Sequence, residues 1–523
     1  MKNRLFALTA AIVFAAPLFG LEQPVKTRDG LVSGAAGTDK SILVFKGIPF
    51  AAPPAGDLRW RAPQPAAQWQ GVRKAEKFSA SCMQNIADER KPWTYEFMTH
   101  TEVSEDCLYL NVWTAAKSAS EKRPVFVYIH GGGFSEGSGA VPVYDGEGLA
   151  KKGLVVVTIN YRLGILGFFV HPELSKESPN GVSGNYALLD MIAALRWIQA
   201  GIANFGGDPS RVTIAGQSAG AMAVHDLIAS PLAKGLFHRA IIESGGSTIG
   251  RAGINMGSTT LKDAEAAGVR FAEAKGGKSI AGLRAMSWQQ LVQPAAASGG
   301  GRPTGAPIVD GHILPLSAND AVFQGKHNDV PVLTGMNAGE LGGLVAAPGA
   351  MTLERFRSQA TQRYGAGAEK FLALYPASND AEAAAAQTDA NRDQALVSMY
   401  LWARARSKTS KTKVFQYLFD HPLPGPDAAR YGAFHSGELP YVLNTLYTCP
   451  RPITDVDRKI AGTLSSYWAN FAASGDPNSK GLPMWPAYSD KAVVMEIGDK
   501  DEPVPVAGNA AKQAFFEAYL TRP

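Results

Sequence analysis

Residues 211–229, RVTIAGQSAGAMAVHDLIA, join an apolar run, a Gly-x-Ser-x-Gly motif and a helical pattern in immediate succession. Residues 211–215 predict a buried strand and residues 219–228 a helix. Ser218 then lies on the tight turn between them, at a helix N-terminus where backbone N–H groups favour developing negative charge. The flanking glycines suit this turn because the strand and helix backbones pass too close for larger side chains. The segment therefore predicts a nucleophilic serine.

A second Gly-x-Ser-x-Gly match spans residues 133–137, but its Ser135 neither follows a strand directly nor opens a helix, so we interpret it as a loop serine. The overlapping run His130-Gly-Gly-Gly-Phe134 leaves a predicted strand, and its glycines present backbone N–H groups without side-chain obstruction. Together with the N–H of Ala219, just after the nucleophile, this run predicts an oxyanion hole.

The fold class follows from apolar runs that alternate with helical patterns. Residues 185–200 carry apolar side chains at close to a 3.6-residue period. Such alternation predicts an α/β fold, an open and mostly parallel sheet with helices on both faces, whose site lies at the carboxyl ends of the strands. The predicted strands are residues 125–129, 154–159, 212–215, 240–243, 331–334 and 414–419.

Two long excursions interrupt this alternation, at about residues 250–330 and 341–413. They are rich in Ala, Gly and Glu and contain no internal repeat, so we expect helical cap insertions within one large domain, residues 21–523. The alternative is two separable domains.

The first twenty residues have the pattern of a secretory signal peptide. Lys2 and Arg4 precede an apolar run over residues 5–19, which is too short for a membrane span. Cleavage is expected near Gly20, and the protein is expected to be periplasmic or extracellular. No later segment suggests a membrane span.

Composition excludes several classes of protein. Hydrophobic residues make up 46% of the 523 residues and charged residues 19%, with a net charge of +5 and no basic cluster, so we expect no nucleic-acid partner. Export permits disulfides, and pairing Cys82 with Cys107 would pin the polar loop between them, worth about 3.5 kcal/mol by loop entropy. Cys449 remains as a buried, inert thiol. No spacing of His or Cys indicates a metal site, and no cofactor is implied.

A serine nucleophile needs a histidine base and a carboxylate, which follow it in the order serine, acid, histidine in α/β hydrolases. His421 and His435 both follow the last predicted strand, and position alone favours His435 without excluding His421. Glu340 stands just past the strand at 331–334, whereas its rival Asp310 precedes that strand and resembles a turn residue.

Blocks along nearly the whole mature chain resemble the type-B carboxylesterase family, which includes bacterial para-nitrobenzyl esterases and has the α/β-hydrolase fold. Those blocks are Phe45-Lys-Gly-Ile-Pro-Phe-Ala51, Leu58-Arg-Trp60, Glu105-Asp-Cys-Leu-Tyr-Leu-Asn-Val112, Phe205-Gly-Gly-Asp-Pro209, Gly216-Gln-Ser-Ala-Gly220, Trp468-Ala-Asn-Phe-Ala472, Gly475-Asp-Pro-Asn478 and Trp485-Pro486.

The resemblance implies a catalytic triad of Ser218, Glu340 and His435. It also implies oxyanion donors at Gly132, Gly133 and Ala219, a disulfide between Cys82 and Cys107, and an ion pair between Arg59 and Glu105. Three positions depart from the family. Gln217 replaces a frequent Glu, Gly339 replaces a frequent Asp, and the loop tryptophan of cholinesterases falls near Phe97, although Trp93 is close by. Specialisation for choline esters is therefore not expected.

These expectations combine into a secreted serine carboxylic-ester hydrolase that acts on small to medium esters by an acyl-enzyme mechanism, with no cofactor. The same triad would serve an amidase, a thioesterase or a transacylase. A non-catalytic, neuroligin-like binding protein on this fold is the alternative of another class.

Overall fold

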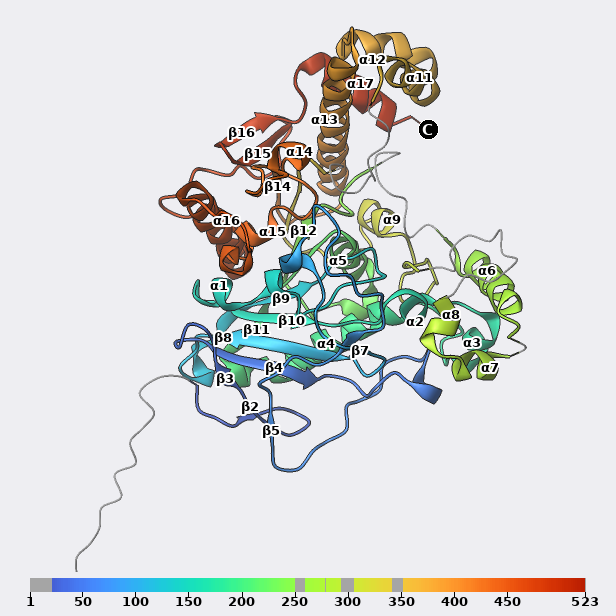
Figure 1. Ribbon diagram of the computed structural model, residues 1–523, viewed down its shortest axis with the longest axis vertical. Coiled ribbons are helices and arrows are strands. Elements are labelled where there is room, and N and C mark those ends of the chain that lie inside the picture. Colours follow the sequence, from blue (N-terminus) through green and yellow to red (C-terminus); the bar gives the residue numbers. More distant parts are fainter. Residues whose placement is uncertain (1–20, 250–258, 278, 293–304, 341–350, 523) are drawn as a thin grey trace, which may run out of the picture.

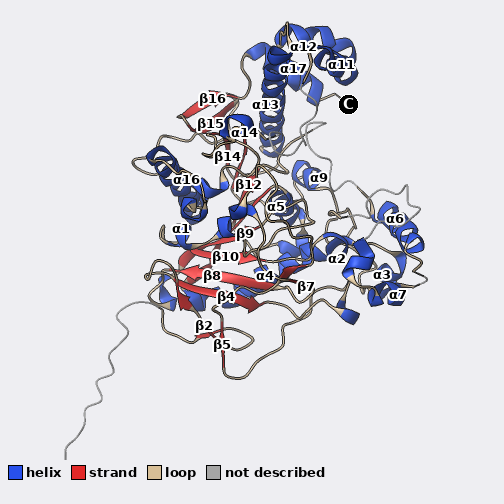
Figure 2. Ribbon diagram, viewed as in Figure 1, coloured by secondary structure: helices blue, strands red, loops and turns tan. Residues whose placement is uncertain are grey.

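The computed structural model describes residues 21–249, 259–277, 279–292, 305–340 and 351–522. The predicted signal peptide, residues 1–20, lies outside the described residues, as do parts of both predicted cap insertions. An eleven-stranded sheet runs through the molecule (Figure 1, Figure 2). In spatial order its strands are β16 (Asp501–Pro505), β15 (Val493–Gly498), β14 (Val414–Asp420), β13 (Val332–Asn337), β12 (Arg239–Glu243), β11 (Gly207–Gln217), β9 (Arg123–Ile129), β10 (Val155–Ile159), β8 (Tyr109–Thr114), β4 (Leu43–Pro49) and β3 (Ala35–Ala36).

The six predicted strands are neighbours in this sheet, from β14 to β10, and every pair among them is parallel. The remaining strands extend the sheet on both sides. β8, β4 and β3 add antiparallel pairs at one side, while β15 pairs in parallel with β14 and carries the antiparallel β16. The predicted α/β class is confirmed, with a sheet larger than the apolar runs alone indicate.

Alternating side chains of β9 enter two different hydrophobic cores. Val125, Val127 and Ile129 pack with α4 (Tyr186–Gly201) and α5 (Ala219–Ala229) on one face of the sheet. Phe126 and Tyr128 face the opposite core. That core contains α1 (Glu147–Ala150), α15 (Leu439–Val442) and α16 (Asp455–Ser474). This is the period-two burial of a strand covered by helices on both faces.

Both predicted excursions are helical where they are described (Figure 1). The second forms a lobe at one end of the molecule, where its long helix α13 packs against the C-terminal helix α17. The first comprises α6 (Leu261–Ala274), α7 (Ile280–Ala285), α8 (Trp288–Val292) and α9 (Ala318–Phe323); the second comprises α11 (Leu353–Tyr364), α12 (Ala368–Leu374) and α13 (Asp380–Arg406), with α17 at Ala510–Leu520. Their function as caps stays a prediction.

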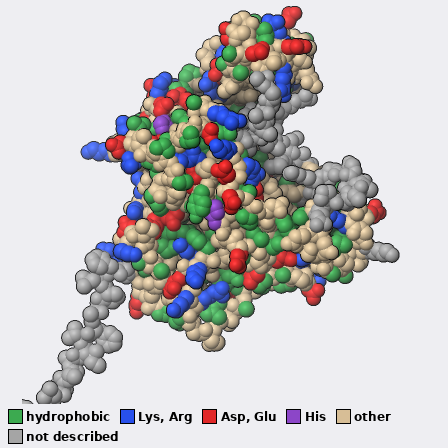
Figure 3. Space-filling model, in the orientation of Figure 1, with side chains coloured by type: hydrophobic (Ala, Val, Ile, Leu, Met, Phe, Trp, Pro, Cys, Tyr) green, Lys and Arg blue, Asp and Glu red, His purple; other side chains and the backbone are tan. Residues whose placement is uncertain are grey.

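The smaller elements lie around this core. A separate sheet contains β1 (Val25–Lys26), β2 (Leu31–Ser33) and β5 (Val72–Lys74); β6 (Ser81–Cys82) pairs with β7 (Val103–Ser104); and short helices are α2 (Gly164–Phe168), α3 (Pro172–Glu177) and α14 (Ala428–Tyr431). Charged side chains of both signs are mixed over the face drawn in Figure 3. Such a surface fits the small net charge and offers no single-sign field for a polyanion.

One helical segment qualifies as a candidate membrane span by length and composition, contrary to the expectation from the sequence. Tyr186–Phe205 has a mean hydropathy of 1.2, and 67% of that window is buried inside the protein. Its apolar residues pack against the sheet through α4, and a core helix passes the same test. Burial of most of the helix against the sheet, rather than lipid, explains its hydropathy.

The two edges of the large sheet are closed differently. The edge strand β16 contains Pro503 and Pro505, which lack a backbone N–H, together with the acidic residues Asp501 and Glu502. At the opposite edge, β3 is only two residues long. Each edge therefore offers few backbone groups for further pairing.

Candidate active site

Ser218 occupies the turn between β11 and α5, as the sequence predicts. Its backbone has φ 58° and ψ −122°, a left-handed conformation that non-glycine residues adopt at a cost of about 1–3 kcal/mol. A Cβ on Gly220 would overlap the carbonyl oxygen of Ile129, and one on Gly216 would lie 2.5 Å from the carbonyl carbon of Gly220. The motif glycines thus allow the close crossing that exposes Ser218 at the end of the sheet.

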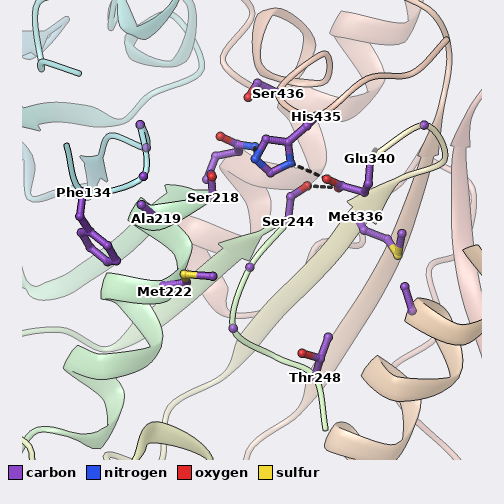
Figure 4. Close-up of a pocket in the computed structure, with 18 of the residues that line it drawn as sticks. Phe134, Ser218, Ala219, Met222, Ser244, Thr248, Met336, Glu340, His435 and Ser436 are labelled. Atoms are coloured by element: carbon purple, nitrogen blue, oxygen red, sulfur yellow. Dashed lines mark hydrogen bonds and ion pairs between the residues drawn. The ribbon is translucent and has the colours of Figure 1, made fainter. Parts of the chain in front are cut away.

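The other predicted site residues reach Ser218 through strand order. β11, β12, β13 and β14 are consecutive parallel strands, so the loops after them lie at the same edge of the sheet. Glu340 follows β13 and His435 follows β14. Figure 4 shows the imidazole of His435 between Ser218 and Glu340, with Ser244 from the end of β12 beside the carboxylate.

His435 and Glu340 are directly hydrogen-bonded, from Nδ1 of the imidazole to Oε2 of the carboxylate. The other carboxylate oxygen, Oε1, accepts from the backbone N–H of Asn337 at 2.8 Å and from the Ser244 hydroxyl. Burial alone would raise the pKa of Glu340, but the adjacent His435 and these hydrogen bonds lower it. Burial alone would lower the pKa of His435, but Glu340 raises it overall. Glu340 thus stabilises the protonated imidazole.

The second imidazole nitrogen, Nε2, lies 3.1 Å from the side-chain nitrogen of Gln217. Within the described part of the chain, no hydrogen bond joins Ser218 Oγ to His435. The structure therefore brings the predicted base and acid into contact and places the predicted nucleophile beside them. The Gln217 amide occupies the imidazole nitrogen that would accept the proton of that nucleophile. Catalytic hydrogen bonds are often incomplete without substrate. The sequence marks Gln217 only as a departure from the family.

The predicted oxyanion donors, Gly132, Gly133 and Ala219, line the same cavity as Ser218. Gly132 has φ 108° and Gly133 φ 60°, both in the region that favours glycine, and a Cβ on Gly132 would overlap the carbonyl oxygen of Glu136. The N–H groups of these two glycines donate to no acceptor among the described residues. Ala219 opens α5, where the first N–H groups have no partner within the helix. The arrangement suits a bound oxyanion.

Three positioning contacts are absent from the sequence-based predictions. Asn337 links acid and base, because its N–H donates to Glu340 and its side-chain amide donates to the carbonyl oxygen of Phe434 at 2.7 Å. Ser244 holds the far side of the Glu340 carboxylate. The indole N–H of Trp93 donates to the carbonyl oxygen of His435 at 3.1 Å. Asn337 ends the observed strand β13, but the predicted strand at 331–334 stops before it, so the sequence contains no direct signal for these contacts.

Trp93 lies in the loop between the disulfide-bonded residues Cys82 and Cys107. Cys82 and Cys107 form a disulfide with a Cα–Cα distance of 5.0 Å, and Cys449 is a buried free thiol. Trp93 and Phe97 both pack against Phe434, with ring centroids 6.4 and 6.0 Å apart from it. The loop thus supports the backbone of the base rather than being a free excursion.

Two further features of the family resemblance have a structural form. Arg59 Nε donates to Glu105 Oε2 at 2.8 Å, which is the implied ion pair. The departure at Gly339 has a steric reason, since a Cβ there would lie 2.9 Å from the carbonyl oxygen of Ala433. A side chain at this position would therefore press on the loop that carries the base.

The rival residues have other partners. His421 lies between Asp499, at 2.6 Å from Nδ1, and Asp457, at 3.2 Å from Nε2. Asp310 closes a turn by accepting the backbone N–H groups of residues 312–314. Ser135 is exposed and donates only to the carbonyl oxygen of Gly132, at 3.3 Å. None of the three contacts Glu340 or His435 within the described residues.

Two other buried acids lie behind the triad. Burial raises the pKa of Glu243 to about 8 even though the Trp468 indole donates to it at 2.5 Å. Burial also raises the pKa of Glu438 to about 8, while the Asn337 side chain donates to it. At neutral pH both groups are mainly protonated, which leaves Glu340 as the ionised carboxylate beside His435.

Ser218, His435 and Glu340 open onto one large cavity of about 2320 Å³. Met222, one turn below Ser218 on α5, also lines it (Figure 4). Among the described residues no group of three or more His, Cys, Asp or Glu side chains could hold a metal ion.

Comparison with known proteins matches residues 22–516 to the carboxylesterase family. Fumonisin B1 esterase of Sphingopyxis macrogoltabida is 39% identical over 493 residues, which cover 91% of this chain and 86% of that protein. Para-nitrobenzyl esterase of Bacillus subtilis is 34% identical, covering 90% of this chain and 93% of the relative. A solved PNB esterase structure superimposes with a TM-score of 0.77 at 30% identity, covering 95% of this chain and 99% of the other.

Proposed function

Since the chain belongs to the carboxylesterase family, we propose that it is a serine esterase that hydrolyses small to medium carboxylic esters through an acyl-enzyme intermediate. The observation that carries the proposal is the hydrogen bond of His435 with Glu340 beside Ser218, at the mouth of a large cavity. Its relatives are named for esters of different size, fumonisin B1 and para-nitrobenzyl esters among them, and a cavity of about 2320 Å³ suits a broad range.

In the first half-reaction Ser218 Oγ attacks the ester carbonyl and passes its proton to His435 Nε2. The Gln217 amide moves off that nitrogen as the substrate enters. Gly132, Gly133 and Ala219 donate to the oxyanion, and Glu340 stabilises the imidazolium. The C–O bond then breaks, His435 gives the proton to the leaving alcohol, and the acyl group stays on Ser218.

In the second half-reaction water attacks the acyl-enzyme while His435 takes one of its protons. The tetrahedral adduct is held by the same N–H donors, and its collapse releases the carboxylic acid as His435 returns the proton to Ser218. The cycle consumes one water and leaves the enzyme unchanged. His435 is the general base and the general acid of both half-reactions.

The base predicts the pH dependence. His435 must be neutral to accept a proton, and Glu340 raises its pKa above the usual histidine value of about 6.5. We therefore expect kcat/KM for 4-nitrophenyl butanoate to fall below a midpoint above about pH 6.5, because the imidazole becomes protonated. Initial rates across a pH series test this. A profile that stays flat down to about pH 4 would contradict the assignment of His435.

We also propose that the protein is exported and loses its first residues. The charged start and short apolar run of residues 1–20 support this, and the Cys82–Cys107 disulfide fits an oxidising compartment. Intact-mass measurement of protein recovered outside the cytoplasm is expected to give a chain that begins near Leu21. Recovery of the full-length chain inside the cell only would overturn the proposal.

A further inference from the structure

Asp226 is a buried carboxyl group in the wall of the catalytic cavity. Met222 is four residues after Ser218 along α5, and Asp226 is eight residues after it. This spacing puts the three residues on one side of the helix, and all three line the cavity. Asp226 is only 8% exposed. With a rise of 1.5 Å per residue, eight residues place its backbone about 12 Å from Ser218 along the helix.

No described residue makes a hydrogen bond or ion pair with the Asp226 carboxyl group. Burial raises the pKa of Asp226 to about 8, and no neighbouring charge contributes to this shift. The position is costly on two further grounds. A carboxyl group that is mostly buried and has no protein partner loses part of its hydration, and an acid in the last turn of a helix meets the negative end of the helix dipole. Nothing in the fold repays these costs.

The neighbouring cavity wall has more polar groups without partners. Ser247 Oγ and Asn319 Oδ1 are buried and accept or donate no hydrogen bond within the described chain, and both residues line the cavity. They come from elements adjacent to α5. A Cβ on Gly246 would lie 3.0 Å from the His225 side chain, and Asn319 is anchored by its donation to the Thr248 carbonyl oxygen at 2.8 Å. These two unpartnered atoms lie in the wall of the same cavity as Asp226 and point to a ligand that completes them.

We propose that Asp226 is a substrate-binding residue that receives a protonated amino group of the ester. The proposal rests on the esterase function above and names a substrate class for it. A bound ammonium group favours the ionised form of Asp226 and brings three N–H donors, one for Asp226 and two for neighbouring acceptors or water. Met222 is four residues from both Ser218 and Asp226 along α5, and all three line the cavity. The substrate would therefore carry an apolar chain between its ester carbonyl and its amine.

Other ligand chemistries fit this position less well. An anionic group would meet a carboxyl with no cation beside it. A metal ion needs several ligands, and none of the described acidic, cysteine or histidine side chains forms a group with Asp226 that could hold one. A hydroxyl group would supply one donor and no charge. Of these ligand groups, a protonated amine offers the largest number of hydrogen bonds to the Asp226 carboxyl and the unpartnered atoms near it.

The test compares esters that differ only at the chain end. 4-Nitrophenyl 6-aminohexanoate and 8-aminooctanoate carry an ammonium group where 4-nitrophenyl heptanoate and nonanoate carry a methyl group. 6-Aminohexyl butanoate and heptyl butanoate make the same comparison on the alcohol side. We expect Asp226→Asn to lower kcat/KM about ten-fold for the preferred amino ester, mainly through KM, and to leave its methyl counterpart within about two-fold.

Asp320→Asn is the matched control. Asp320 lines the same cavity and undergoes the same acid-to-amide change, but it is exposed and already accepts a hydrogen bond from Ser317 at 2.5 Å. This variant is expected to leave the ratio of amino to methyl ester unchanged. An Asp226→Asn variant whose ratio equals that of the wild type in all three ester pairs would overturn the proposal.

A second measurement separates this proposal from the esterase function. If the wild type hydrolyses none of these esters, the proposed function is wrong, and calorimetric titration with hexylammonium chloride then tests Asp226 alone. Binding that weakens about ten-fold in Asp226→Asn supports the amine site. Equal binding by the wild type and this variant overturns it.

Discussion

Replacing Ser218 with alanine is expected to lower kcat for 4-nitrophenyl butanoate by about 10⁶-fold, the loss typical of removing a serine nucleophile. Alanine has no oxygen to form the acyl-enzyme, so the residual rate comes from water and the oxyanion donors alone. The residue change removes one atom on a turn whose backbone already has φ 58°. The fold should therefore persist, with a midpoint of thermal unfolding close to that of the wild type.

Ser135→Ala is the matched control for this experiment. Ser135 occupies the other Gly-x-Ser-x-Gly match and lines the same cavity, but it is exposed and does not contact His435. Its replacement is expected to leave kcat within about two-fold, as for most surface substitutions. Activity near the wild-type value in Ser218→Ala, or loss of activity in Ser135→Ala alone, would refute the assignment of the nucleophile.

Glu340→Gln is expected to lower kcat by about 10⁴-fold, the effect of the corresponding acid-to-amide change in a serine triad. The carboxylate accepts from Nδ1–H of His435 and so leaves Nε2 free to act as base. A glutamine amide can instead donate to Nδ1, which moves the imidazole proton to Nε2 and removes the base. It also takes away the negative charge that stabilises the imidazolium.

Glu243→Gln makes the same chemical change in a neighbouring buried acid. Glu243 has a pKa raised to about 8 by burial, so it is already mainly neutral at pH 7, and it accepts hydrogen bonds from Trp468 and Tyr128. This variant is expected to retain kcat within a few-fold. Equal losses in the two variants would show that burial of a polar group, rather than the triad, explains the effect.

The fold could be predicted from the sequence where burial leaves a continuous run of apolar residues. The six parallel strands are covered on both faces, so each is a continuous apolar run. The turn at Ser218 was predictable because glycines flank it in the sequence. Outer strands give no such signal. β4 is largely buried but is interrupted by Lys46 and Gly47, and β16 is mostly exposed and contains two prolines.

The sequence predicted which residues meet at the candidate site, but not the residues that support them. His421 and His435 both follow β14, and what separates them is long-range. His421 contacts Asp457 of α16 and Asp499, which follows β15. The carbonyl oxygen of His435 instead accepts from Trp93, which lies in a disulfide loop far away in the chain. Asp226 has an ordinary helical setting in sequence, and only the packing around α5 leaves it buried and unpartnered.

The closed edges of the sheet bear on how the protein behaves at high concentration. Molecules polymerise through sheets when an exposed strand lends its free N–H and C=O groups to a second copy. Pro503 and Pro505 interrupt that row on β16, and β3 offers only two residues. A concentrated solution of folded molecules is thus protected against fibre growth by edge-to-edge addition, and self-assembly of that kind would first require unfolding.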